Sequence, residues 1–133
     1  MCAFATTKNT QTFRKAERLT SRKIFNLLVK QGRSVNESPF RLIWLKTTLE
    51  SPFPAQVAFA VPKKNFKSAV KRNRIKRMMR EVYRKNKASF YPLLVQKEQQ
   101  LALLLVYTGN TIPEYAEVEE KITLILQRLA ELF

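Results

Sequence analysis

One stretch, Lys63 to Lys87, constrains the fold more than any other, because its charged and apolar residues separate onto two sides of a single helix. Twelve of its twenty-five residues are Lys or Arg, and Glu81 is the only acid among them. At about 100° per residue, its large apolar residues recur at helical spacing and share one face. The pattern predicts an amphipathic helix with an apolar face on a core and a basic face outside. The apolar face consists of Ile75, Met78, Met79, Val82 and Tyr83.

The charge of this helix indicates a polyanion as its partner. Helices that are merely solvated usually alternate acids and bases at i, i+4, and here only Glu81 can pair, with Lys85 or Arg77. A solvated basic face that binds nothing is the alternative interpretation.

The first turn of the helix also indicates an anionic partner. We expect Ser68 to be the N-cap, which places Lys71 and Arg72 where cations oppose the helix dipole by about a few tenths of a kcal/mol. Such a cost is explained if these side chains meet phosphates. The residues predicted to bind the polyanion, which is RNA if the resemblance described below holds, are Lys63, Lys64, Lys67, Lys71, Arg72, Asn73, Arg74, Lys76, Arg77, Arg80 and Arg84.

The whole chain is basic, with a formal net charge of +15 over 133 residues. Its 45% apolar residues suffice for a folded domain, so this charge indicates nucleic acid or an anionic membrane as partner. The longest apolar run, Leu101 to Tyr107, is far shorter than the roughly 20 residues of a membrane span, which argues against the membrane. We expect residues 1–17 to form a basic tail and residues 18–133 a single RNA-binding domain.

Two further features indicate where in the cell the protein is expected. The first residues lack the apolar segment of a signal peptide, and Cys2 is the only cysteine, which excludes an internal disulfide and a cysteine zinc site. We therefore expect a cytoplasmic protein, monomeric when free.

The acids argue against catalysis by the protein itself. The chain contains no His, and all ten of its acids are Glu. Nucleases that cut with side chains generally need a His base or a carboxylate cluster that holds metal ions. The only acids close together lie at the start of a predicted helix, where they suit its dipole: Glu114, Glu117, Glu119 and Glu120. We predict no catalytic residue and no protein-bound metal or other cofactor.

The remaining elements follow from periodicity and turn residues. A first helix is predicted from an N-cap at Thr20 or Ser21 to Gly32, whose access to positive φ suits a C-cap. Its apolar stripe is Ile24, Phe25 and Leu28. Alternation predicts strands at 40–47 and 56–61, which we expect to form an antiparallel pair.

The C-terminal part contains a loop, a strand and a helix. Residues 91–100 are predicted as a loop around Pro92, with a short helical turn within it as the alternative, and the apolar run 101–107 as a central strand. The buried face of the last helix is predicted to be Val118, Ile122, Ile125, Leu129 and Leu132. The order indicates an α/β protein with one mixed sheet.

The basic stretch also carries a family resemblance. The run from Lys67 to Arg77, preceded by Val61-Pro62-Lys63-Lys64 and followed by Arg80-Glu81, resembles the signature of the bacterial ribonuclease P protein subunit. This chain differs from the family at Asn65 and Phe66, where a Gly and one residue fewer are usual. The segment from Thr12 to Gly32 resembles the start of that subunit.

The resemblance implies a fold and a function. The fold is a two-layer sandwich of three helices and a mixed sheet of about four strands, in the order α-β-β-(β)-α-β-α, with the extra strand within Arg33 to Glu37. It carries a left-handed βαβ crossover and is of the ribosomal protein S5 domain 2-like type. The function is that of a ribonucleoprotein endonuclease, a hydrolase of tRNA processing, in which a catalytic RNA removes the 5′ leader of precursor tRNA. Mg2+ then acts with the RNA.

The resemblance also implies a site for the leader, which is single-stranded. Single strands are held by aromatic faces beside cations. We expect this cleft where the first helix, the sheet and the start of the basic helix meet. Its predicted lining is Phe13, Phe25 and either Trp44 or Phe40, with Arg72, Asn73, Lys76 and Arg80 on its wall. Two other interpretations stay open: an RNA-binding protein of the ribosomal or chaperone class, and a DNA-binding protein that uses the basic helix.

Overall fold

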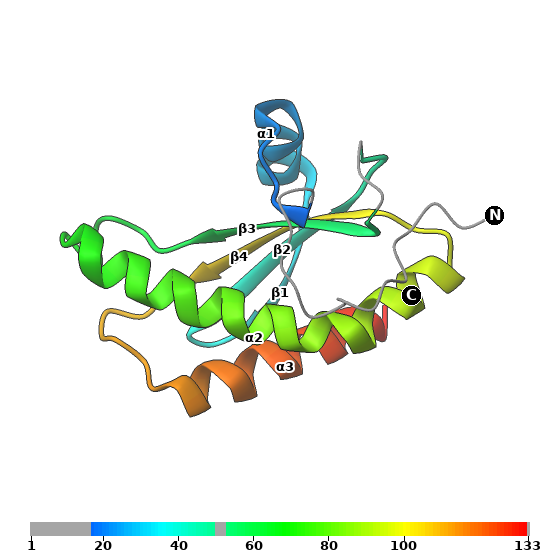
Figure 1. Ribbon diagram of the computed structural model, residues 1–133. Coiled ribbons are helices and arrows are strands. Elements are labelled where there is room, and N and C mark those ends of the chain that lie inside the picture. Colours follow the sequence, from blue (N-terminus) through cyan, green and yellow to red (C-terminus); the bar gives the residue numbers. More distant parts are fainter. Residues whose placement is uncertain (1–16, 50–52, 133) are drawn as a thin grey trace.

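The computed structural model describes residues 17–49 and 53–132, which form three helices and four strands (Figure 1). The predicted order is confirmed, and the extra strand lies within the expected segment. Phe13 and the rest of the predicted tail up to residue 16 lie outside the described residues. The elements are α1 (Arg22–Gln31), β1 (Arg33–Glu37), β2 (Phe40–Lys46), β3 (Ala55–Ala60), α2 (Ala69–Gln96), β4 (Leu101–Tyr107) and α3 (Tyr115–Ala130).

The four strands form one mixed sheet in the order β1-β2-β4-β3. β4 runs antiparallel to β2 and parallel to β3. The predicted antiparallel pair of β2 and β3 is therefore wrong, because β4 lies between them. Its residues 101–105 are all buried, which requires a strand on each edge and cover on each face. β3 and β4 are joined through α2, and the hand of this crossover stays a prediction.

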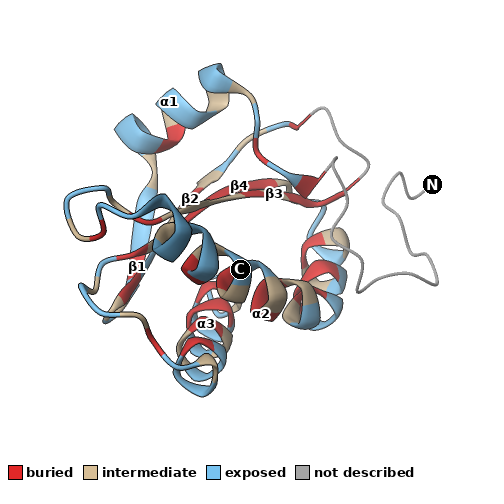
Figure 2. Cartoon of the chain, turned by 60° about the vertical axis from the view of Figure 1, so that its left-hand side comes forward, coloured by how far each residue is buried: buried red, intermediate tan, exposed pale blue. Residues whose placement is uncertain are grey.

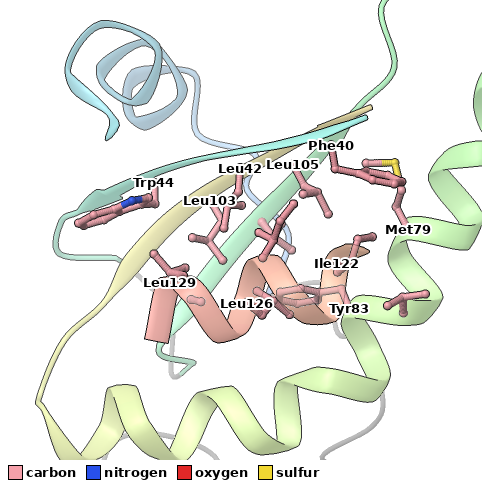
Figure 3. Close-up of a cluster of buried hydrophobic side chains, with 14 of the residues drawn as sticks. Phe40, Leu42, Trp44, Met79, Tyr83, Leu103, Leu105, Ile122, Leu126 and Leu129 are labelled. Carbon is pink, nitrogen blue, oxygen red and sulfur yellow. The ribbon is translucent and has the colours of Figure 1, made fainter. Parts of the chain in front are cut away.

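The helices lie on both faces of the sheet. α2 and α3 lie side by side beneath one face, and α1 stands on the other (Figures 1 and 2). The larger core fills the space between the sheet and the helix pair, with Leu103 and Leu105 of β4 opposite Ile122 of α3 (Figure 3). A smaller core under α1 contains Leu28, Ala102 and Leu104. Successive side chains of β4 point to opposite faces of the sheet, so this strand contributes residues to both cores.

α2 has the predicted cap and apolar face, and it is longer than expected. The Ser68 hydroxyl accepts from the backbone N–H of Lys71 at 3.4 Å, and the five predicted apolar residues pack on the core. The predicted loop at 91–100 is wrong at its start, since the helix continues through Pro92 to Gln96. Pro92 has no N–H for the carbonyl of Ala88, but both residues are exposed, so water can solvate that carbonyl. Burial of neighbouring apolar residues keeps the helix intact: Phe90, Tyr91 and Leu94.

α1 begins and ends where predicted, but for a different reason at its end. The Ser21 hydroxyl caps its start, accepting from the N–H of Ile24 at 3.3 Å. Gly32 is the C-cap with φ −67°, so the expected positive φ is wrong. Glycine is needed here for space, because a Cβ would lie 2.3 Å from the carbonyl oxygen of Leu28 and 2.6 Å from Cγ2 of Ile43.

α3 buries the predicted face with one exception. Val118, Ile122, Ile125 and Leu129 are buried, as expected from their spacing. Leu132 lies beyond the helix and is exposed, so its predicted burial is wrong. Leu126 takes a place in the core that the prediction did not give it.

Candidate nucleic-acid interface

The loop before α2 and the part of α2 up to Arg84 carry the eleven predicted RNA-binding residues, ten cations and Asn73. We call these eleven residues the basic row. Arg84 pairs with Glu81, its Nε donating to the carboxylate at 3.1 Å, and this hydrogen bond lowers the pKa of Glu81. Within the described ranges 17–49 and 53–132, no other member of the basic row forms a salt bridge. The exposed members are Lys63, Lys64, Lys67, Lys71, Asn73, Arg74, Arg77 and Arg80, and the half-buried members are Arg72, Lys76 and Arg84.

The loop before α2 is fixed to the end of β4. The Asn65 amide donates to the carbonyls of Thr108 and Gly109 at 3.3 and 3.2 Å. Phe66 is buried, with its ring 6.2 Å from that of Tyr107. Asn65 and Phe66 thus hold the loop in place.

Arg72 has a structural contact of its own. Its guanidinium donates to the carbonyl of Phe66 at 3.0 Å. A guanidinium carries five N–H donors, so Arg72 keeps further donors that can bind a phosphate. Arg72 therefore both orders the loop and belongs to the basic row.

The sheet face on the side of α1 is apolar and partly open. Strand alternation and pairing place Ile43, Leu104 and Ala58 in one line across the sheet, and Arg41, Val106 and Ala60 in the next. Leu104 is buried, Arg41 is exposed and the other four are half-buried. We call these six residues, together with Phe25 of α1, the α1-face surface.

This surface adjoins the basic row through the chain itself. Only Val61 and Pro62 separate Ala60 from Lys63, so their Cα atoms lie within about 11 Å of each other. Phe25 is 37% exposed, which leaves its ring available to a ligand. An apolar floor, an exposed aromatic ring and neighbouring cations are the features that bind single-stranded nucleic acid.

The structure does not bring Phe40 and Trp44 to this surface. Both point from β2 toward the helix pair, on the sheet face away from α1 (Figure 3). Phe40 is 1% and Trp44 7% exposed, and Phe40 packs on Tyr107 with ring centroids 5.0 Å apart. They serve the larger core, so of the four predicted aromatics Phe25 alone is described on the α1 side.

Comparison with known proteins identifies the family. The family description Ribonuclease P matches residues 13–130. The chain belongs to the ribonuclease P protein family. It is 33% identical to the "Ribonuclease P protein component" of Chlorobium phaeobacteroides, covering 91% of each chain, and 29% identical to that of Porphyromonas gingivalis, covering 87% of this chain and 85% of the relative.

The fold agrees with this membership. The solved Staphylococcus aureus RNase P protein superposes with a TM-score of 0.68 at 20% identity, covering 86% of this chain and 96% of that one. In this ribonuclease P family member the signature run Lys67–Arg77 forms the first turns of α2 and the loop residues before them. Seven of the eleven members of the basic row therefore belong to this run.

Two further features of the described part were not found from the sequence. The first is the set of strand residues that line the α1-face surface, since the prediction gave the place of the cleft but lined it with Phe40 or Trp44. The signal for the correct lining was the alternation of Arg41, Ile43 and Leu45 on β2 and the small Ala58 and Ala60 on β3. The second is a buried ion pair of Glu17 and Lys87, two residues predicted in the tail and in the basic stretch. No local pattern signals a pair between residues so far apart.

Two classes of site are not found among the described residues. No group of three or more His, Cys, Asp or Glu side chains lies together there, and no helix of that part could cross a membrane.

Proposed function

We propose that this chain is the protein component of a ribonuclease P and binds both the catalytic RNA and the 5′ leader of precursor tRNA. Family membership and the names of its bacterial relatives support a role in the 5′ processing of tRNA. The observation that carries the proposal is a row of cations, nearly free of acids, beside an apolar sheet face with an exposed ring. Such a surface binds RNA and performs no chemistry on it.

The catalyst is assigned to the RNA. A sequence without His and without Asp offers no general base of the usual kind and few carboxylates for metal ions. The Mg2+ ions of the reaction are therefore placed with the RNA. The basic row lowers the repulsion between catalytic RNA and substrate, which favours their assembly and the retention of Mg2+ there.

The catalytic RNA and the leader bind to different surfaces of the protein. The basic row meets phosphates of the catalytic RNA, without reading base edges, and its contacts are therefore sensitive to salt. The α1-face surface receives the leader, with a base on Phe25 and its phosphates near Lys63 and Lys64. Both RNA partners of a bacterial cell lie in the cytoplasm, where we place the protein.

A reconstitution experiment tests this division. Cleavage of precursor tRNA is measured with the purified protein, with the catalytic RNA, and with both, over a range of Mg2+ concentrations. We expect no cleavage by the protein at any Mg2+ concentration, and a lower Mg2+ requirement for both together than for the RNA. Cleavage by RNA-free protein that a substitution in this chain abolishes would refute the proposal.

A further inference from the structure

A buried cluster joins the start of the described chain to the second half of α2. Nζ of Lys87 lies 2.7 Å from each carboxylate oxygen of Glu17, and the two residues are 1% and 0% exposed. The Tyr91 hydroxyl donates to Glu17 at 2.7 Å and lies 3.0 Å from the Tyr83 hydroxyl. We call these four residues the Glu17 cluster. Burial raises the pKa of both tyrosines, so their hydroxyls remain protonated and able to donate.

Stability alone does not explain such a cluster. Removing two charges from water is costly, and buried ion pairs can often be replaced by apolar residues of similar volume without loss of stability. What an ion pair with fixed hydrogen bonds adds is a single geometry.

The three residues from Glu17 to Leu19 pass around the free edge of β3. Glu17 packs with Lys87 and Tyr91 on the side of the helix pair, and Leu19 belongs to the smaller core under α1. Between them Arg18 forms a parallel bridge with Val57, and the N–H of Leu19 donates to the Val57 carbonyl at 3.0 Å. The chain therefore changes sheet face at this point, and the Glu17 cluster fixes where it does so.

α1 depends on this crossing for its position. It begins at Arg22, three residues after Leu19, and most of it is exposed (Figure 2). Leu28 is its only buried residue, and Ile24 is half-buried against the smaller core. Because α1 packs so little against the sheet, its position depends largely on how its two ends are attached. These attachments are the segment from Glu17 to Leu19 before the helix and the close packing around Gly32 after it. Phe25, the exposed ring of the α1-face surface, moves with it.

We propose that Glu17 and Lys87 are positioning residues for leader binding, because the Glu17 cluster holds α1, and with it Phe25, in register over the sheet. This inference rests on the proposed leader site and adds that residues of the opposite sheet face control it. Lys87 thus acts through the fold, unlike the cations of the basic row. Neither residue touches the leader.

The test compares holoenzymes for their affinity for precursor tRNA with a leader and for mature tRNA without one. In the double variant Glu17→Leu, Lys87→Met the melting temperature should stay the same or rise, while the preference for the leader falls about tenfold, the loss of about one stacked base. The charge swap Glu17→Lys, Lys87→Glu should restore the preference. Amide exchange should quicken in α1 of the double variant and stay unchanged in α3.

Controls separate this inference from its premise. The surface pair Glu37 and Arg128, whose side chains are 22% and 50% exposed, provides the double variant Glu37→Gln, Arg128→Met, which should leave the leader preference unchanged. If the double variant of the Glu17 cluster does not fold, Tyr91→Phe, which removes one hydrogen bond and keeps the ring, should still lower the preference. A full leader preference in the folded double variant, or in Tyr91→Phe, would overturn the inference. A wild-type holoenzyme without leader preference would refute the leader site itself.

Discussion

Phe25 and Phe40 carry the same side chain in opposite surroundings, the first 37% and the second 1% exposed. Phe40→Ala should lower the free energy of unfolding by about 3 to 5 kcal/mol, because it opens a cavity in the larger core. Phe25→Ala should change it little and weaken the binding of leader-bearing substrate by about 1 to 3 kcal/mol, or roughly 5- to 150-fold. Denaturant unfolding and substrate affinity measure the two effects. Equal weakening for substrates with and without a leader would remove Phe25 from the site.

Gly32 illustrates a residue that is required for space. Because a Cβ there would overlap the Leu28 carbonyl and the Ile43 side chain, Gly32→Ala should destabilise the protein by more than about 1 kcal/mol. Gly109→Ala provides a comparison, since the nearest atom to its added Cβ is the Tyr107 hydroxyl oxygen, 2.4 Å away, and the other near atoms also belong to that side chain and not to backbone. Urea unfolding of both variants measures the costs. A Gly32→Ala protein as stable as the wild type would contradict this account of the C-cap.

At the scale of elements, Pro92 lies inside α2 and leaves one hydrogen bond of the helix unmade. Pro92→Ala should therefore raise the free energy of unfolding, by about 1 to 3 kcal/mol, since Ala is a far better helix former and both Pro92 and Ala88 are exposed. Denaturant unfolding measures the gain. A loss of stability would show that the ring of Pro92 makes contacts that the helix needs.

Elements with a strong local pattern could be predicted from the sequence, and their partners could not. The spacing of Ile75, Met79 and Val82 on one side of the cations was enough for the buried face of α2. Alternation showed which residues of β2 share a face, but it does not show which helix covers that face, so Phe40 was grouped with Phe25. Nothing local to β3 indicates that β4 enters between it and β2.

At the scale of the whole molecule, charge is distributed by role. The net charge of +15 gives a field that attracts RNA from a distance, whereas only cations in contact with phosphates release counterions on binding. Lys87 contributes weakly to the long-range attraction, since Glu17 neutralises its charge. It contributes nothing to counterion release, because it is buried and meets no phosphate. Counting the cations of the sequence therefore overstates the number of contacts, and the exposed members of the basic row set the expected salt dependence.

The most direct test of the central claim, that the basic row binds the catalytic RNA, is the salt dependence of the affinity between protein and RNA. Replacing Arg74, Arg77 and Arg80 by Ala should lower the slope of log affinity against log salt by about 2 to 3, since each phosphate contact contributes about 0.7 to 0.9. A control with Lys97, Lys121 and Arg128 replaced by Ala removes the same charge outside the basic row and should leave the slope unchanged. An unchanged slope in the first variant, or equal changes in both, would contradict the account.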